Sequence, residues 1–309
     1  MGNALFAAAG TNVAPKTVEL IADAGFRNGF RVNESGEEKR VVKWNNSGTP
    51  AWDILHHHSK SSFANTNNFS FRKDGLTFKD DCGTLVVHPD GREADFILGM
   101  NAFKEFDGVY RPVGDPWPHV YFSQRVSNLH GHSAQNIPLS AMDKIDFSIS
   151  VKLLYDNRNE KEGYNRHIHA AQFVFFFTIQ NVNRQSLGYG DYYWFGILLY
   201  DSRKPVTSLH AMQDKGWPKK KGTDKLIYDI GVKPFTSEVV ADGKWVAVKG
   251  DLLPHIIAGL QESWKRGFLQ GSKNVADYQI GGVVMGYEIT GLNDIAVAVR
   301  DLRATAMIR

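Results

Sequence analysis

Glu288 is the residue whose type and position most clearly suggest chemistry. It lies near the end of a glycine-rich segment, residues 280–291 (IGGVVMGYEITG), in which alternation places Gly282, Val284, Gly286 and Glu288 on one strand face. Small side chains leave room above a sheet face, and a carboxylate there can reach a ligand. This spacing favours either a catalytic or ligand-binding acid or an ordinary solvent-facing strand residue.

A second strand pattern, residues 171–180 (AQFVFFFTIQ), separates a core face from a polar face. The three phenylalanines Phe173, Phe175 and Phe177 share one face and are expected in the core. The opposite face contains Gln172, Val174, Phe176 and Thr178. Amide groups and aromatic rings can bind a sugar by hydrogen bonds and stacking, so Gln172 and Phe176 are candidate ligand-binding residues.

Aromatic residues are dense just beyond this segment, at Tyr189, Tyr192, Tyr193, Trp194 and Tyr200. Sugar rings present apolar C–H faces that stack on flat aromatic rings, while their hydroxyls need polar partners. Alternation sends Tyr193 and Phe195 to the face opposite Tyr192 and Trp194. We therefore expect Tyr192 and Trp194 to bind the ligand and Tyr193 to be core.

A second carboxylate could come from Asp201, which follows the end of the same strand in LYDSR, or from Asp191, which opens it. Two carboxyl groups can cooperate as acid and as nucleophile or base when they lie about 5 Å or about 6.5–9.5 Å apart. Asp201 is the candidate catalytic partner of Glu288. The alternative is that Asp201 pairs with Arg203 or caps a turn.

The histidines allow a different chemistry. His167 and His169 have the spacing that puts two side chains on one strand face, as do His130 and His132. With Arg166, Tyr164 and Gln172, the first pair would suit β-elimination from a uronate, in which His or Tyr moves the proton. A metal would need a third ligand that the sequence does not identify, and His56-His57-His58 is expected in a solvated loop.

No metal and no cofactor are therefore predicted. The single cysteine, Cys82, excludes an internal disulfide framework, and it has no basic neighbour that would activate a catalytic thiol. Phosphate-binding glycine loops, nucleophile-elbow serines and HExxH motifs are absent from the sequence.

These residues must be positioned by strands, because period-two alternation between turn residues recurs along the chain. One helix is predicted over residues 251–267, with Asp251 as N-cap, and is expected to cover the outer face of a sheet. The pattern predicts an all-β sandwich or jelly roll forming one domain over 1–309, with irregular strands and loops over about 1–70 packed on it. Strands are predicted over residues 119–126, 144–154, 168–180, 192–200, 225–231, 244–248, 278–288 and 294–299, with shorter ones at 84–88 and 95–100.

The helix, the Gly-rich strand ending in GYEITG and a final hydrophobic strand resemble glycoside hydrolase clan C, especially family 12. The resemblance implies a concanavalin A-like β-jelly roll with a concave glycan cleft, and Glu288 as the general acid/base. It places the family's nucleophile on the strand at residues 171–180, where this chain has Gln172. An amide cannot form the glycosyl-enzyme ester or act as a base.

The sequence favours a carbohydrate-active protein of the glycoside hydrolase type, using Glu288 and a second acid. The alternatives are a polysaccharide lyase using the histidine-rich strand and a non-catalytic lectin-like module. The expected partner is a polysaccharide or oligosaccharide. Lys+Arg 36 against Asp+Glu 33, without a basic block, argues against nucleic acid. No apolar run approaches the roughly 20 residues of a membrane span. The first ten residues lack the basic start of a secretory signal, although an extracellular or periplasmic location is favoured.

Overall fold

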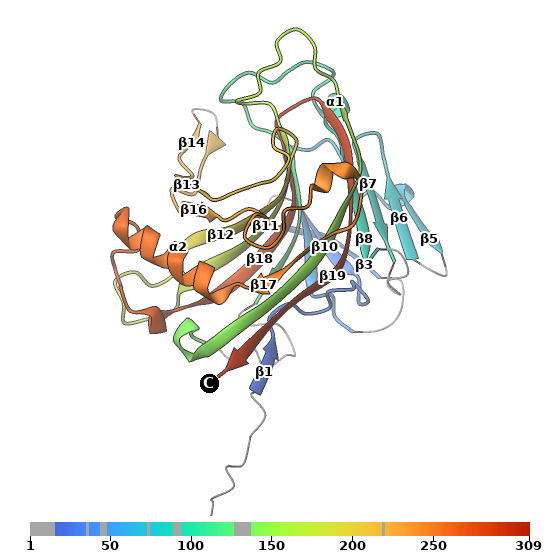
Figure 1. The fold of residues 1–309 in the computed structure, drawn as a ribbon. Helices are drawn as coiled ribbons and strands as arrows, with labels where there is room; N and C mark the ends of the chain where they lie inside the picture. The colour runs from blue at the N-terminus through green and yellow to red at the C-terminus, as the bar shows by residue number, and fades with distance from the viewer. Residues whose placement is uncertain are drawn as a thin grey trace, which may run out of the picture.

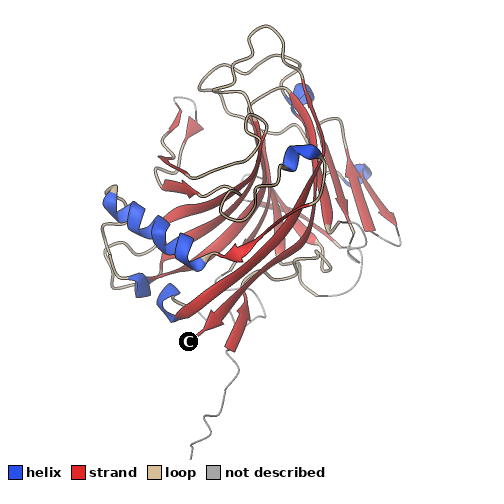
Figure 2. Ribbon diagram, in the orientation of Figure 1, coloured by secondary structure: helices blue, strands red, loops and turns tan. Residues whose placement is uncertain are grey.

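Alternating apolar and polar residues form two large β-sheets that stack face to face (Figures 1 and 2). The computed structural model describes residues 16–34, 37–43, 48–72, 75–88, 94–126, 137–217 and 220–309. Within them the predicted all-β sandwich of two stacked sheets is confirmed. The first ten residues and the His130/His132 pair lie outside the described residues.

The first sheet, sheet A, contains the two longest strands of the protein. In spatial order its strands are β17 (Val246–Asp251), β10 (Met142–Arg158), β19 (Asn293–Ile308), β8 (Phe96–Asn101), β7 (Gly83–Val87), β6 (Gly75–Lys79) and β5 (Phe69–Arg72). The short strand β1 (Lys16–Glu19) pairs with the end of β19, so the C-terminus lies beside the first described strand (Figure 1).

The second sheet, sheet B, carries the candidate site. Its order is β13 (His210–Gln213), β16 (Leu226–Asp229), β12 (Tyr192–Asp201), β11 (Ala171–Asn181), β18 (Tyr278–Ile289), β9 (His119–Arg125), β4 (Trp52–His57), β2 (Phe30–Glu34) and β3 (Glu37–Val42). A separate hairpin joins β14 (Gly216–Trp217) to β15 (Lys220–Lys221).

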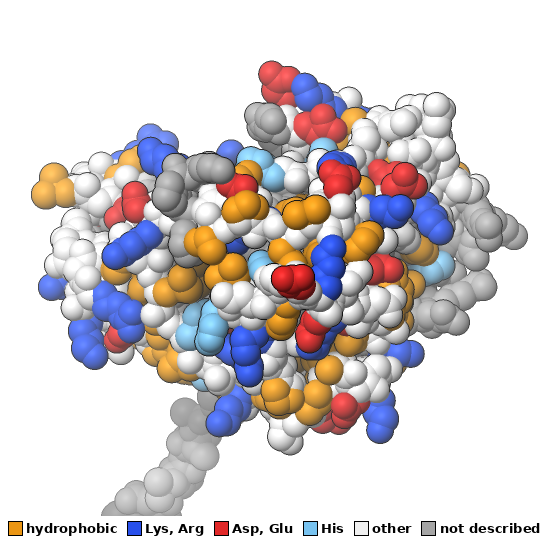
Figure 3. All heavy atoms as spheres, turned by 90° about the horizontal axis from the view of Figure 1, so that it is seen from above, with side chains coloured by type: hydrophobic (Ala, Val, Ile, Leu, Met, Phe, Trp, Pro, Cys, Tyr) orange, Lys and Arg blue, Asp and Glu red, His pale blue; other side chains and the backbone are white. Residues whose placement is uncertain are grey.

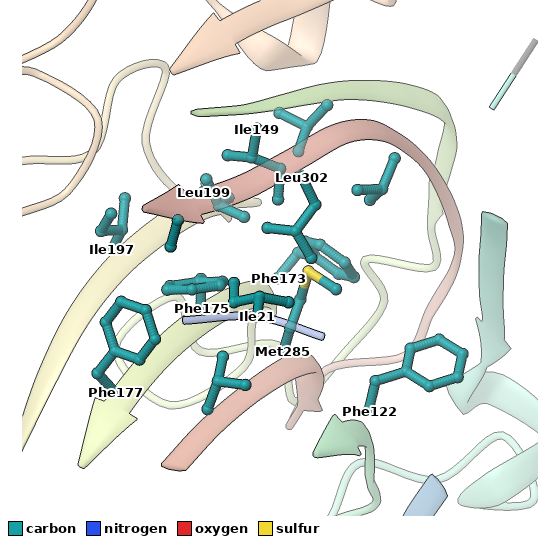
Figure 4. Packing of buried hydrophobic residues seen from close by; sticks show 14 of the residues in the cluster. Ile21, Phe122, Ile149, Phe173, Phe175, Phe177, Ile197, Leu199, Met285 and Leu302 are labelled. Atoms are coloured by element: carbon teal, nitrogen blue, oxygen red, sulfur yellow. The ribbon is translucent and has the colours of Figure 1, made fainter. Parts of the chain in front are cut away.

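Each sheet has an inner face, which looks toward the other sheet, and an outer face. Phe173, Phe175 and Phe177 of β11 are fully buried on the inner face, as predicted. Figure 4 draws them in one buried hydrophobic cluster with Met285 of β18, from the same sheet, and Ile149 of β10, from the opposite sheet. Because the inner residues occupy every second position, the intervening residues of sheet B must share its outer face.

The helical segments are few. The longest is α2 (Leu253–Lys265), and the others are α1 (Ala102–Glu105) and the 3-10 turns η1 (Thr66–Asn68), η2 (Leu139–Ala141), η3 (Val240–Asp242) and η4 (Val275–Asp277). In the described parts of the chain no helix is long and apolar enough to cross a membrane.

The predicted helix over 251–267 is confirmed as α2, but it covers a different face from the one predicted. The Tyr193 hydroxyl, on the inner face of β12, donates to the Ile256 carbonyl oxygen at 2.5 Å, and a Cβ added to Gly259 would touch that tyrosine. Helix α2 therefore packs on the inner face of sheet B. The side chain of Asp251 accepts from the Leu253 amide at 3.0 Å, although the helix itself starts one residue later than predicted.

Two predictions of local structure are wrong. The strand predicted from residue 168 begins at Ala171, because residues 165–169 form a turn closed by bonds from the Ile168 and His169 amides to the Asn165 carbonyl. The histidine run expected in a loop instead starts within β4, where His56 and His57 end the strand. Leu55 on the outer face of β4 weakens the alternation that identifies a strand.

Candidate functional site

A row of polar side chains crosses the outer face of sheet B at one end of its strands. Strand register pairs Glu288 of β18 with Gln172 of β11 on one side and with His119 of β9 on the other. Beyond these, Gln172 pairs with Asp201 of β12, and His119 pairs with His57 of β4. We call these five residues the polar row. The structure thus brings three predicted site residues, Glu288, Gln172 and Asp201, side by side.

Glu288 is partly exposed and is held by a neighbour that the sequence analysis did not select. The Tyr121 hydroxyl, on the outer face of β9, donates to Glu288 Oε1 at 2.6 Å. Tyr121 also lies 3.4 Å from His119 Nδ1. Burial, and then the neighbouring Glu288 carboxylate, raise the pKa of Tyr121 well above its usual range, so this tyrosine is a hydrogen-bond donor at neutral pH.

Asp201 is held in a buried ion pair. Its side chain is 0% exposed, and both carboxylate oxygens accept from Arg203, at 2.9 Å from Nε and 2.7 Å from Nη2. Gln172 Nε2 donates to Asp201 Oδ2 at 3.0 Å. Burial would raise the pKa of Asp201, but the hydrogen bonds from Arg203 and Gln172 outweigh it and hold the pKa below the usual value. Both oxygens of Asp201, the predicted catalytic partner of Glu288, are therefore already paired within the protein.

The aromatic side chains gather at the other end of the same face. Phe176, Trp194 and Tyr192 form what we call the aromatic end: the Phe176 and Trp194 rings lie 5.9 Å apart, and the Trp194 and Tyr192 rings 5.3 Å apart, edge to face. Thr223 Oγ1 accepts from Trp194 Nε1 at 3.3 Å, and Lys225 Nζ lies 5.5 Å from the Tyr192 ring centroid. Tyr193 and Phe195 are fully buried on the opposite face, as predicted.

Gly282 and Gly286 lie on β18 between the aromatic end and the polar row, and the space around an added Cβ differs between them. A Cβ added to Gly282 would meet only the Gln124 carbonyl oxygen at 3.2 Å and Thr178 Oγ1 at 3.7 Å, so the space above it is largely open. A Cβ added to Gly286 would lie 2.1 Å from the Val120 carbonyl oxygen, at a φ of +156°. The prediction that both leave room for a ligand therefore fits Gly282, whereas Gly286 permits close packing of β18 on β9.

His167 and His169 do not share a strand face, contrary to the prediction. His167 is exposed on the turn before β11, whereas His169 is buried, accepts from the Asn165 amide at 3.0 Å and stacks on Tyr110 with ring centroids 4.3 Å apart. Burial lowers the pKa of His169. Because Arg166 is also exposed on that turn, this set does not join Gln172 on the outer face.

Sequence reasoning missed His119 and Tyr121, although a signal for them was present. In HVYFSQR, residues 119–125, the buried Val120 and Phe122 alternate with His119 and Tyr121. Treating that strand like the strand at 171–180 would have assigned both residues to the outer face. Over the residues that can be described, no group of three or more His, Cys, Asp or Glu side chains is arranged to hold a metal ion.

The fully buried Tyr193 and Tyr287, together with the half-buried Tyr121, predict a steep loss of stability at alkaline pH. Burial raises the pKa of Tyr121, Tyr193 and Tyr287 well above the unfolded value of about 10. A group whose pKa is raised on folding adds to the free energy of unfolding. This contribution is fully present below pH ~10, the unfolded pKa, and is lost as the pH rises through the folded pKa. We expect absorbance at about 295 nm to show these tyrosines ionising only as the chain unfolds. Tyr121→Phe should make the alkaline fall in the urea midpoint shallower, and ionisation of Tyr121 near pH ~10 in the folded protein would contradict this.

Comparisons with known proteins identify no family. No protein-family model matches the sequence, and no curated protein matches it. Among solved structures the chain is similar to endoglucanase Cel12A from Rhodothermus marinus, with 12% identity, 76% of this chain and 93% of that chain covered, and a TM-score of 0.40. The family 11 xylanase from Neocallimastix patriciarum has 9% identity, coverage of 77% and 93%, and a TM-score of 0.39. The endo-1,4-β-glucanase CelB2 has 12% identity, coverage of 75% and 86%, and a TM-score of 0.36.

Proposed function

We propose that the outer face of sheet B binds a glycan chain between its aromatic end and its polar row. One observation carries the proposal: a single sheet face combines clustered, partly exposed aromatic rings with partly exposed amide and carboxylate groups. A sugar needs both kinds of partner, because its C–H faces are apolar and its hydroxyls both donate and accept. Trp194, Phe176 and Tyr192 would stack on the rings, and Glu288 and Gln172 would bind hydroxyls.

The charge of the molecule fits a ligand without strong charge. The formal net charge is +3, and in Figure 3 basic and acidic side chains are interspersed with hydrophobic ones over the face in view. On the outer face of sheet B, Asp201 is neutralised by Arg203, Asp53 by Arg31 and Asp191 by Lys225. These pairs leave no strong field that would select a polyanion.

The geometry favours glycan binding without cleavage over a hydrolysis reaction that uses two carboxylates. The residues in register beside Glu288 are Gln172 and His119, and the next carboxylate along the row, Asp201, is already occupied by Arg203. Both the retaining and the inverting mechanism need a second accessible carboxylate. Hydrolysis through Glu288 is the second candidate, favoured by the partial exposure of Glu288 and its fixed bond to Tyr121.

Loss of the central aromatic ring should weaken glycan binding. Trp194→Ala is expected to raise the dissociation constant of an oligosaccharide selected on a glycan array by about 30-fold, or about 2 kcal/mol, because Trp194 contacts both other rings of the aromatic end. Tyr192→Ala should have a smaller effect in the same direction. Calorimetry measures both. Trp245→Ala is the matched control, because Trp245 is also partly exposed but lies over Arg300 of sheet A. Equal affinity of Trp194→Ala and wild type would overturn the proposal.

Glu288→Gln separates binding from catalysis. The amide keeps the shape of the side chain but removes its charge, so affinity should fall only about fivefold, roughly 1 kcal/mol. We expect wild type to release no reducing ends from the selected glycan and to produce no absorbance near ~235 nm, the signal of an unsaturated uronate. Reducing-end release that falls about 100-fold in Glu288→Gln would instead establish Glu288 as a catalytic acid.

A further inference from the structure

A pocket of about 280 Å³ opens beside the C-terminal half of β10, and none of the residues of the polar row or the aromatic end lines it. Its lining includes Leu154, Tyr155, Asp156 and Arg158 of β10, Tyr200 of β12, and Asp242 of η3. Tyr200 lies on the inner face of sheet B, and its hydroxyl reaches the pocket. Its neighbour in the chain, Asp201, points to the outer face. The pocket is therefore separate from the site proposed above.

The strand arrangement creates this pocket. Pairing of β17 with β10 stops at Val246 and Val151, whereas β10 continues to Arg158 along β19. The space that a longer β17 would fill is bounded instead by the turn at residues 241–243. A register shift between Leu153 and Tyr155 leaves two consecutive apolar residues exposed, Leu154 by 40% and Tyr155 by 41%. Bulges of this kind redirect side chains and are frequent beside functional sites.

A fixed hydrogen-bond network forms the polar wall of the pocket. The Asp156 carboxylate, 4% exposed, accepts from the Tyr200 hydroxyl at 2.7 Å, Asn293 Nδ2 at 2.7 Å and Arg158 Nε at 3.0 Å. Burial and then the Asp156 carboxylate raise the pKa of Tyr200, so its hydroxyl stays a donor. The Arg158 side chain is 39% exposed, which leaves part of its guanidinium accessible. A wall already held by internal bonds loses little entropy when a ligand binds.

We infer that this pocket is a second saccharide-binding site, which takes one or two sugar rings. Its volume of about 280 Å³ lies just below the roughly 300–1,000 Å³ of drug-sized ligand sites, which suits a ligand of one or two rings. Tyr155 and Leu154 supply an apolar surface for a ring face, and Arg158 and Asp242 supply groups that bind hydroxyls. Two carboxylates, Asp156 and Asp242, against the single guanidinium of Arg158 disfavour a phosphate or another anion. The inference does not require that the outer face of sheet B bind a glycan.

Amide NMR of the full-length, deuterated chain tests the site residue by residue. Glucose, xylose, mannose, galactose and N-acetylglucosamine are each added to about 50 mM, a concentration that reveals millimolar binding. At least one sugar should shift the amides of residues 154–158 and 241–243, and Tyr155→Ala should weaken that binding at least tenfold. Absence of such shifts with all five sugars, or shifts with inorganic phosphate alone, would overturn the inference.

Two control variants separate this site from the first. Phe71→Ala removes an aromatic residue that is 49% exposed on β5, outside both sites, and should leave the shifts at 154–158 unchanged. Trp194→Ala should also leave them unchanged. If Trp194→Ala abolished them, the pocket would not be an independent site. If the shifts at 154–158 appeared while the amides around Trp194 never responded to any glycan, the proposed function would fail and the second site would stand.

Discussion

Arg203→Ala is expected to lower the free energy of unfolding by about 3–5 kcal/mol at neutral pH. The substitution removes both guanidinium donors and the positive charge from Asp201, whose side chain is 0% exposed. The carboxylate keeps only the Gln172 amide and the backbone N–H of residue 203 as donors. A buried charge without its counter-charge is among the few single changes that cost this much. Urea denaturation at neutral pH measures the loss.

The pH dependence of this loss identifies its cause. The folded pKa of Asp201 lies below its unfolded value of about 3.9, so the contribution of the pair is present above that value and is lost as the pH falls through the folded pKa. The difference between wild type and Arg203→Ala should therefore be largest above pH ~5 and should shrink toward pH ~3. Asp201→Asn in the Arg203→Ala background should recover part of the stability, because the amide carries no charge.

The same experiment bears on function. If Arg203→Ala left stability unchanged, Asp201 would not depend on the ion pair, and it would again be available as the second acid of a hydrolase. The expected loss instead assigns Asp201 to the framework that orients Gln172 beside Glu288.

Gly286→Ala is expected to destabilise the protein by about 4 kcal/mol or more. The new methyl group would lie 2.1 Å from the Val120 carbonyl oxygen, and the residue would keep a φ of +156°, which L side chains rarely adopt. Relief requires β18 to move away from β9. That movement would separate Glu288 from Tyr121, so glycan affinity should fall in any fraction that still folds.

Gly282→Ala is the matched control, because Gly282 lies on the same strand and the same face. Its Cβ would meet no backbone atom closer than 3.2 Å and would need no unusual φ. We expect this variant to change stability by less than about 1 kcal/mol. Thermal melts of both variants make the comparison. Equal stability of the two would mean that β18 and β9 can separate without cost.

Several features followed from local pattern alone. The alternation of Phe173, Phe175 and Phe177 with Gln172 and Phe176 determined which residues face the core, because strand side chains point to opposite faces in turn. The same rule correctly placed Tyr193 opposite Trp194. The amphipathic spacing of residues 251–267 likewise determined a helix, which the structure places at Leu253–Lys265.

The local sequence pattern could not predict which strands pair with one another. Alternation gives a residue its face but not its neighbour, since the partner strand and the register are set by the packing of the whole sandwich. Thus Glu288 and Tyr121, separated by 167 positions in the chain, meet at 2.6 Å only because β18 pairs with β9. The turn at residues 165–169 also removed His167 and His169 from a strand that the sequence pattern had extended to them.

Sequence alone therefore determined an all-β sandwich, a core face, an aromatic set and Glu288 as a candidate. Only the tertiary structure decided which of these residues act together. In the folded chain Asp201 forms an ion pair with Arg203, and Tyr121 donates a hydrogen bond to Glu288. Residue 286 must be glycine because the backbone of the neighbouring strand β9 leaves no room for a side chain. The physical reason is that burial and pairing, which determine whether a carboxylate is available or occupied, depend on contacts between strands far apart in the chain.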